Sequence, residues 1–227
     1  MRIAHQHPCI FVVVLLLSSC SGGNTDSGSG ALPSGDYSSL YTYNAYRLDG
    51  HTIRWVSTTI SVYGATGVGW QEAINRWPTV RFQFVDSKPS SGIEILGYDD
   101  LGNACGLSSF VYDSAGRMET CTIKISNKHE PLDCGKEADT VAHEIGHCIG
   151  IFKHTSDGGL MDETAEDSTE ITSAVKNMMG LLYALSPGAD INAQLAARRP
   201  GKTQRTSRYQ PDGGTRYNGG LAIVARQ

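Results

Sequence analysis

The chain has 227 residues, of which 40% are hydrophobic, and its 23 acidic and 19 basic side chains give a formal net charge of −4. This length suits one domain with flexible ends. The acidic balance and the lack of an aromatic-basic motif argue against a nucleic-acid-binding protein.

Residues 1–19 have the features of a secretory signal sequence. Arg2 precedes an apolar run over 10–17, which is too short to span a membrane as a helix. The run leads through Leu-Ser-Ser to Cys20, and this resembles the lipobox of bacterial lipoproteins. The resemblance implies that Cys20 is lipidated and anchors the exported protein, with Ser21 resembling the outer-membrane sorting signal. The alternative is an ordinary signal sequence and a periplasmic or secreted protein.

The next segments predict a tether and then a domain. Residues 20–36 are rich in serine and glycine and predict a flexible tether, and residues 37–190 predict the folded domain. Alternating or β-branched runs predict strands over 52–57 continuing in 59–63, and over 80–85, 92–96, 107–112 and 121–125, with a helix over 70–77. Strand, helix and then four strands predict an α+β fold with a mixed, twisted sheet of about five strands and a backing helix.

A second helix, over 136–149, carries the most specific motif of the chain. His143, Glu144 and His147 form the pattern H-E-x-x-H. Histidines four residues apart lie on one helical face and can bind one Zn²⁺, while the glutamate next to the first can act as general base. Gly150 follows and predicts the helix stop, because glycine accepts a positive φ.

Beyond this motif the chain predicts one further helix and a basic tail. Apolar residues at helical spacing predict a C-terminal helix over 170–185. Residues 191–227 hold seven basic side chains and one acidic one, whereas residues 20–190 hold 11 basic and 22 acidic ones. We predict a flexible, solvated tail; the alternative is a tail that folds back onto the acidic domain or contacts an anionic surface.

A catalytic zinc needs a third protein ligand, and the chain offers three candidates. In the metzincin pattern H-E-x-x-H-x-x-G-x-x-H the third histidine position is occupied here by Lys153, and His154 follows one residue later. We favour His154, because the chain has left the helix and can absorb an extra residue. Asp157 and Asp162 are the alternatives.

The sequence around Met161 (Gly-Leu-Met-Asp) resembles the metzincin Met-turn. With the helix motif, the chain resembles a metzincin-type zinc peptidase, closest to the bacterial HEIGH metallopeptidase family. The resemblance implies a zinc endopeptidase with Met161 as a hydrophobic base under the metal and an extended peptide or protein substrate paired to the strand over 107–112. We expect Glu144 to activate the metal-bound water, and the protein to be a monomer. The alternatives are an inactive surface binding protein on this fold and a hydrolase of a non-peptide bond.

Four cysteines of the domain predict two disulfides in an exported protein: Cys105, Cys121, Cys134 and Cys148. Cys134 and Cys148 flank one helix and lie about 20 Å apart, too far for a bridge. We prefer Cys105–Cys148 with Cys121–Cys134, which ties the metal helix to the loop after a strand. Cys148 as a zinc ligand is a rival interpretation, but its side chain points away from that of His147.

Overall fold

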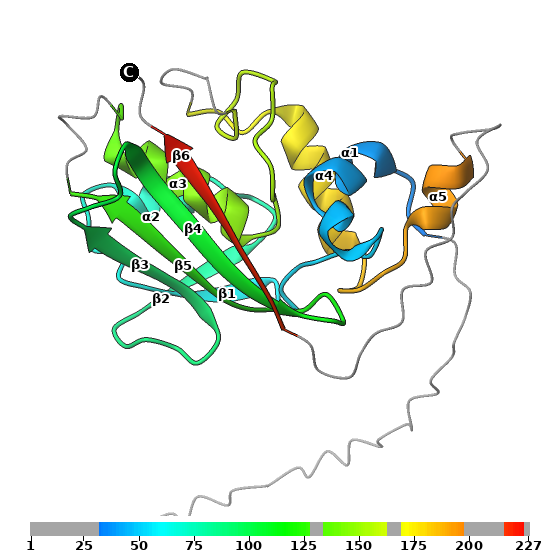
Figure 1. Ribbon diagram of the computed structural model, residues 1–227, viewed down its shortest axis with the longest axis horizontal. Helices are drawn as coiled ribbons and strands as arrows, with labels where there is room; N and C mark the ends of the chain where they lie inside the picture. The colour runs from blue at the N-terminus through cyan, green and yellow to red at the C-terminus, as the bar shows by residue number, and fades with distance from the viewer. Residues whose placement is uncertain (1–31, 128–133, 163–168, 198–215, 225–227) are drawn as a thin grey trace, which may run out of the picture. The chain divides into compact units, whose positions relative to one another are not determined.

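The computed structural model describes residues 32–127, 134–162, 169–197 and 216–224 (Figure 1). The helices are α1 (Tyr37–Tyr43), the 3₁₀ turn η1 (Ala45–Leu48), α2 (Trp70–Ile74), α3 (Glu137–Cys148), α4 (Ser173–Ala184) and α5 (Asn192–Ala197). The strands are β1 (Thr59–Tyr63), β2 (Arg81–Val85), β3 (Gly92–Tyr98), β4 (Ala104–Asp113), β5 (Met118–Ser126) and β6 (Arg216–Val224). The α+β class is therefore confirmed. The predicted signal sequence, Cys20 and most of the tether lie outside the described residues.

The strands form one mixed sheet in the order β2-β1-β3-β5-β4-β6. Strands β2, β1, β3 and β5 are mutually parallel, and β4 is antiparallel to β5. Five of the strands match the predicted number, and β6 is a sixth, antiparallel to β4. It lies in the segment 191–227, which the sequence predicted to be flexible and which also contains α5.

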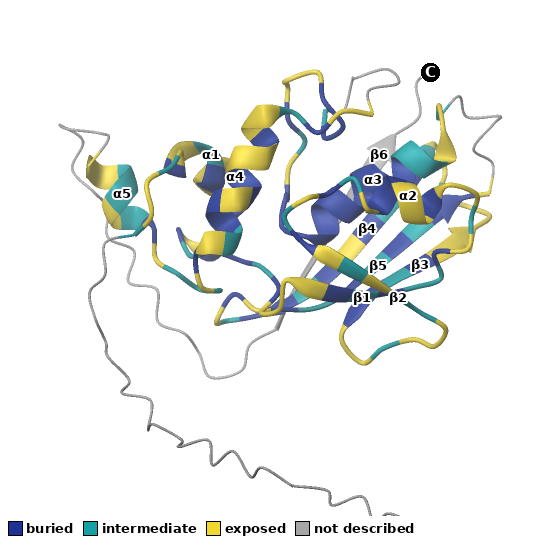
Figure 2. Cartoon of the chain, turned by 180° about the vertical axis from the view of Figure 1, so that it is seen from behind, coloured by how far each residue is buried: buried dark blue, intermediate teal, exposed yellow. Residues whose placement is uncertain are grey.

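Helix α3 lies with α2 across one face of the sheet (Figure 2). From Thr140 to Cys148 every residue of α3 is buried, because the helix packs against β4, β5 and α2. A helix with so little exposed surface must bury its polar side chains, and such side chains need specific partners. Helix α3 is thus both the centre of the core and the carrier of the H-E-x-x-H motif.

The predicted strand over 52–57 is wrong. Only Arg54 makes a β-bridge there, to Arg117. The Thr52 hydroxyl instead donates to the carbonyl of Ser186 at 2.7 Å and accepts from the amide of Ala189 at 3.0 Å. This segment has strand-forming residues, but its polar groups pair with the chain that follows α4.

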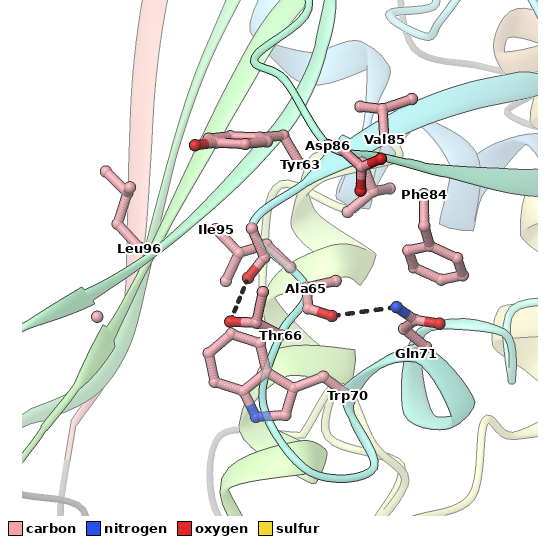
Figure 3. A pocket seen from close by; sticks show the side chains of 13 residues that line it. Tyr63, Ala65, Thr66, Trp70, Gln71, Phe84, Val85, Asp86, Ile95 and Leu96 are labelled. Atoms are coloured by element: carbon pink, nitrogen blue, oxygen red, sulfur yellow. Dashed lines mark hydrogen bonds between the residues drawn. The ribbon is translucent and has the colours of Figure 1, made fainter.

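A pocket lies where the parallel strands β1, β2 and β3 end, beside the start of α2 (Figure 3). Its lining includes Tyr63 at the end of β1, Asp86 after β2, and Trp70. The amide of Gln71 donates to the carbonyl of Ala65 at 3.3 Å across its floor. None of the three candidate histidines and no part of Glu144 lines it, so it is separate from the H-E-x-x-H motif.

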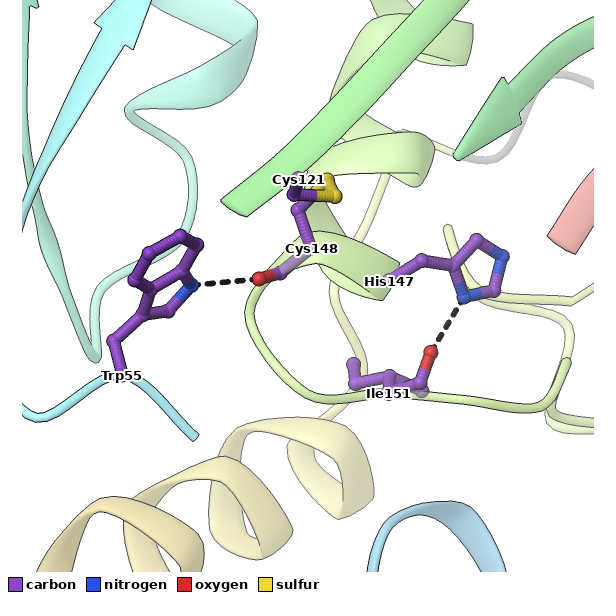
Figure 4. The surroundings of a disulfide bond; sticks show 5 residues. All are labelled: Trp55, Cys121, His147, Cys148 and Ile151. Carbon is purple, nitrogen blue, oxygen red and sulfur yellow. Dashed lines mark hydrogen bonds between the residues drawn. A yellow bond between two sulfur atoms is a disulfide. The ribbon is translucent and has the colours of Figure 1, made fainter. Parts of the chain in front are cut away.

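The described residues form two disulfides, Cys105–Cys134 and Cys121–Cys148, and so correct the preferred pairing; Figure 4 shows the second of them. The prediction that these four cysteines form two disulfides and the exclusion of Cys134–Cys148 are confirmed. Helix α3 runs back over β5, so its C-terminal end lies over the early part of that strand, where Cys121 is. The chain before the helix lies beside the start of β4, where Cys105 is. The indole of Trp55 also donates to the carbonyl of Cys148 at 2.7 Å and fixes this helix end.

Two disulfides indicate a protein that folds in an oxidising environment outside the cytoplasm. Among the described residues, no helix is both long and apolar enough to cross a membrane.

Replacing each disulfide by two alanines is expected to lower the free energy of unfolding by roughly 3–4 kcal/mol, because both bonds close loops of similar length. The loss is expected to be larger for Cys121 and Cys148, since both are buried in the core and leave a cavity. Urea unfolding of the two double variants measures this difference. Peptide mapping without reductant checks the pairing, and a fragment linking Cys105 to Cys148 would contradict it.

Candidate metal and catalytic site

Helix α3 brings two histidine side chains together inside the core. His143 and His147 are one turn apart, with 4% and 0% of their surface exposed, and their Nε2 atoms are 3.1 Å apart. Two imidazole nitrogens that close, both shielded from water, are arranged as a pair of metal ligands would be.

His154 adds a third imidazole from the loop after α3. Its Nε2 lies 3.3 Å from Nε2 of His147, and the ligand atoms of His143, His147 and His154 all lie within 4.8 Å of one another. The three residues could therefore hold one metal ion. The sequence predicted this set, with His154 as the favoured third member.

The loop shows how the chain absorbs the one-residue shift. Gly150 has φ +122° and turns the chain immediately after α3, as the sequence predicted. Lys153 then extends over the ring of Tyr46, with its Nζ 4.0 Å from the ring centroid. Phe152 anchors the loop against Phe110 of β4, with ring centroids 4.5 Å apart. His154, the next residue after the lysine, reaches the histidine pair.

The two alternative third ligands belong to the turn that follows. The Asp157 carboxylate accepts hydrogen bonds from the hydroxyls of Thr155 and Thr172, at 2.7 and 2.5 Å, and from the amide of Gly159 at 3.2 Å. Burial raises the pKa of Asp157, but these hydrogen bonds together outweigh it, so that its pKa lies below the usual value. The Asp162 carboxylate accepts from the amide of Gly158 at 2.8 Å. Neither aspartate is in the group of three histidines.

Backbone carbonyls fix the orientation of both helical histidines. Nδ1 of His143 donates to the carbonyl of Leu160 at 2.6 Å, and Nδ1 of His147 donates to that of Ile151 at 2.5 Å (Figure 4). Because a carbonyl only accepts, the proton is on Nδ1 and Nε2 keeps its lone pair. Burial, together with His154, lowers the pKa of His143 to about 3, and burial and His143 lower that of His147. Both rings are therefore neutral near pH 7, as metal ligands must be.

Glu144 lies beside the histidines and against strand β4. Its side chain is fully buried, and a Cβ atom added to Gly106 would come within 2.7 Å of Glu144 Oε1. Gly106 therefore leaves the space that the carboxylate occupies. Sequence reasoning had no signal to select this glycine, because the contact joins β4 to α3 across the fold.

Met161 forms part of the floor beneath α3. It is 1% exposed, and a Cβ atom at Gly146 would overlap its Sδ and come within 2.7 Å of Trp77 Cζ2. The Trp77 indole also donates to the carbonyl of Ala142 at 2.8 Å. The turn is closed by the amide of Thr155, which donates to the carbonyl of Met161 at 2.8 Å. Sequence reasoning missed Gly146 and Trp77, although a glycine inside a helix often indicates a close approach.

Replacing Gly146 with alanine is expected to lower the free energy of unfolding by about 1–3 kcal/mol, because the new methyl group overlaps Met161 and Trp77. The matched control is Gly180→Ala in α4, where the added Cβ meets nothing within 4 Å. That change is expected to stabilise the protein by about 0.5–1 kcal/mol. Urea unfolding of both variants tests the contact, and equal changes in the two would contradict it.

A comparison with models of known protein families finds no match, and a search of curated protein sequences finds none either.

Proposed function

We propose that the protein is an exported zinc-dependent endopeptidase of metzincin type. The observation that carries this proposal is the convergence of three imidazole nitrogens beside a buried glutamate that belongs to the same helix. A site that only stored zinc would not require Glu144 next to His143.

Zinc is the metal that this donor set favours. Nitrogen ligands at the usual distance from a tetrahedral zinc ion lie roughly 3.3–3.4 Å from one another. The Nε2 atoms of His143 and His147 lie 3.1 Å apart and those of His147 and His154 3.3 Å apart, and the three ligand atoms all lie within 4.8 Å of one another. Three protein ligands would leave the fourth position open, which is the arrangement of catalytic rather than structural zinc sites. Zinc bound there would lower the pKa of a bound water toward ~7 and polarise the scissile carbonyl.

The residues of the chain supply the remaining functions. Glu144 would take the proton of the attacking water and deliver it to the leaving amine. The carbonyls of Leu160 and Ile151 hold the two helical imidazoles in the orientation that presents Nε2. Met161 packs under α3 and keeps the helix in place.

The proposal extends to location and partners. The two disulfides fit an exported protein, and we propose that Cys20 carries a lipid that anchors it to the outer membrane. The substrate is a protein or peptide, and the protein acts as a monomer.

The test uses the chain from residue 22 to 227, which contains every described residue. We expect one zinc per chain by elemental analysis, and cleavage of casein or a peptide library that chelation abolishes and added zinc restores. A zinc content near zero would contradict the site. One bound zinc without cleavage, also after removal of residues 216–227, would support the alternative of an inactive binding protein.

A further inference from the structure

Strand β4 would be an edge of the sheet if β6 were not there. Strand β6 runs antiparallel along almost all of β4, from the pair Ala104 and Val224 to the pair Asp113 and Arg216 (Figure 1). Residues far apart in the sequence thus form the last ladder of the sheet. An edge of this kind is where an extended peptide can add as a further strand through backbone hydrogen bonds.

The part of β4 beside the catalytic carboxylate is covered as well. Gly106, whose absent side chain makes room for Glu144, is paired with Ile223, and Leu107 is paired with Ala222. The backbone of β6 therefore passes the site along the same stretch of β4 that supports Glu144. A peptide whose scissile bond is presented to Glu144 and that pairs with β4 needs the position that β6 holds.

We propose that residues 216–224 occupy the peptide-binding edge of β4, so that a substrate must displace β6 before it is cleaved. This inference rests on the proposed function, and it makes the chain its own competitive inhibitor. The net charges of +6 on residues 191–227 and −11 on residues 20–190 favour association of the tail with the domain, and Arg216 is the one charged side chain within residues 216–224. Tethering also favours it, because a covalently linked segment acts at an effective concentration on the order of millimolar.

The first test compares two truncated chains. The chain ending at Thr215 lacks β6, whereas the matched control ending at Val224 keeps it and loses only the residues beyond. We expect kcat/KM for an unrelated extended peptide to rise at least ~10-fold in the first and to remain unchanged in the second, because the edge is freed only in the first. The synthetic peptide RYNGGLAIV, added in trans, should inhibit the shorter chain competitively. Equal kcat/KM in the two chains, or no inhibition by this peptide, would overturn the proposal.

The second test does not depend on catalysis. Both truncated chains carry Glu144→Gln, and binding of fluorescently labelled RYNGGLAIV is followed by anisotropy. We expect the peptide to bind the chain ending at Thr215 at least ~10-fold more tightly than the chain ending at Val224. Equal affinities in two chains that circular dichroism shows to be folded would overturn the proposal. A clear difference in binding without any cleavage would contradict the peptidase function but still support the inference that β6 covers a peptide-binding edge of β4.

Discussion

Replacing Glu144 with glutamine is expected to lower kcat/KM for peptide cleavage by roughly 10²–10⁴-fold, because the variant loses the group that accepts and delivers the proton. The amide has nearly the same shape as the carboxylate, so it fits the space beside Gly106. The zinc content should remain at one per chain, because the three histidines do not change. Steady-state cleavage assays and elemental analysis of the same sample measure both quantities.

The control for this change is Glu137→Gln in the first turn of α3. Glu137 is exposed and lies at the opposite end of the helix from His147. Its replacement removes the same charge from the same helix and should leave cleavage within about twofold, as for most surface substitutions. Cleavage at the original rate in Glu144→Gln would show that another group accepts the proton.

Replacing His154 with alanine is expected to weaken zinc binding by more than about 100-fold, which exceeds the effect usual for residues that only support a ligand. Two imidazoles would remain where the structure brings three together. Activity should fall with the fraction of zinc bound. A competition titration against a chromophoric chelator measures the affinity.

Two matched variants locate the third ligand. Asp157→Asn removes the charge of the alternative ligand and keeps a side chain that can accept from Thr155 and Thr172, so zinc affinity should change by less than a few-fold. Lys153→Ala removes the residue that occupies the metzincin position, and its side chain lies over Tyr46. We expect zinc affinity to be unchanged there as well. Weaker binding in Asp157→Asn, with normal binding in His154→Ala, would assign the third position to the aspartate.

The sequence by itself determined the features that depend on local periodicity. His143 and His147 share a helical face because they are four residues apart, and the helix ends before Gly150 because glycine tolerates a positive φ. Alternating apolar residues likewise predicted most of the strands and the α+β class. These features are set within a few residues of chain, so a single sequence suffices to find them.

Only the tertiary structure decided the features that depend on which surfaces meet. The direction in which α3 crosses β5 determines the disulfide partners, and the sequence contains no local signal for that direction. The space beside Glu144 comes from Gly106 on another element, and the packing of Met161 and Trp77 explains Gly146. Strand β6 pairs with a strand more than a hundred residues earlier, so the covering of the β4 edge is a long-range contact that periodicity cannot predict.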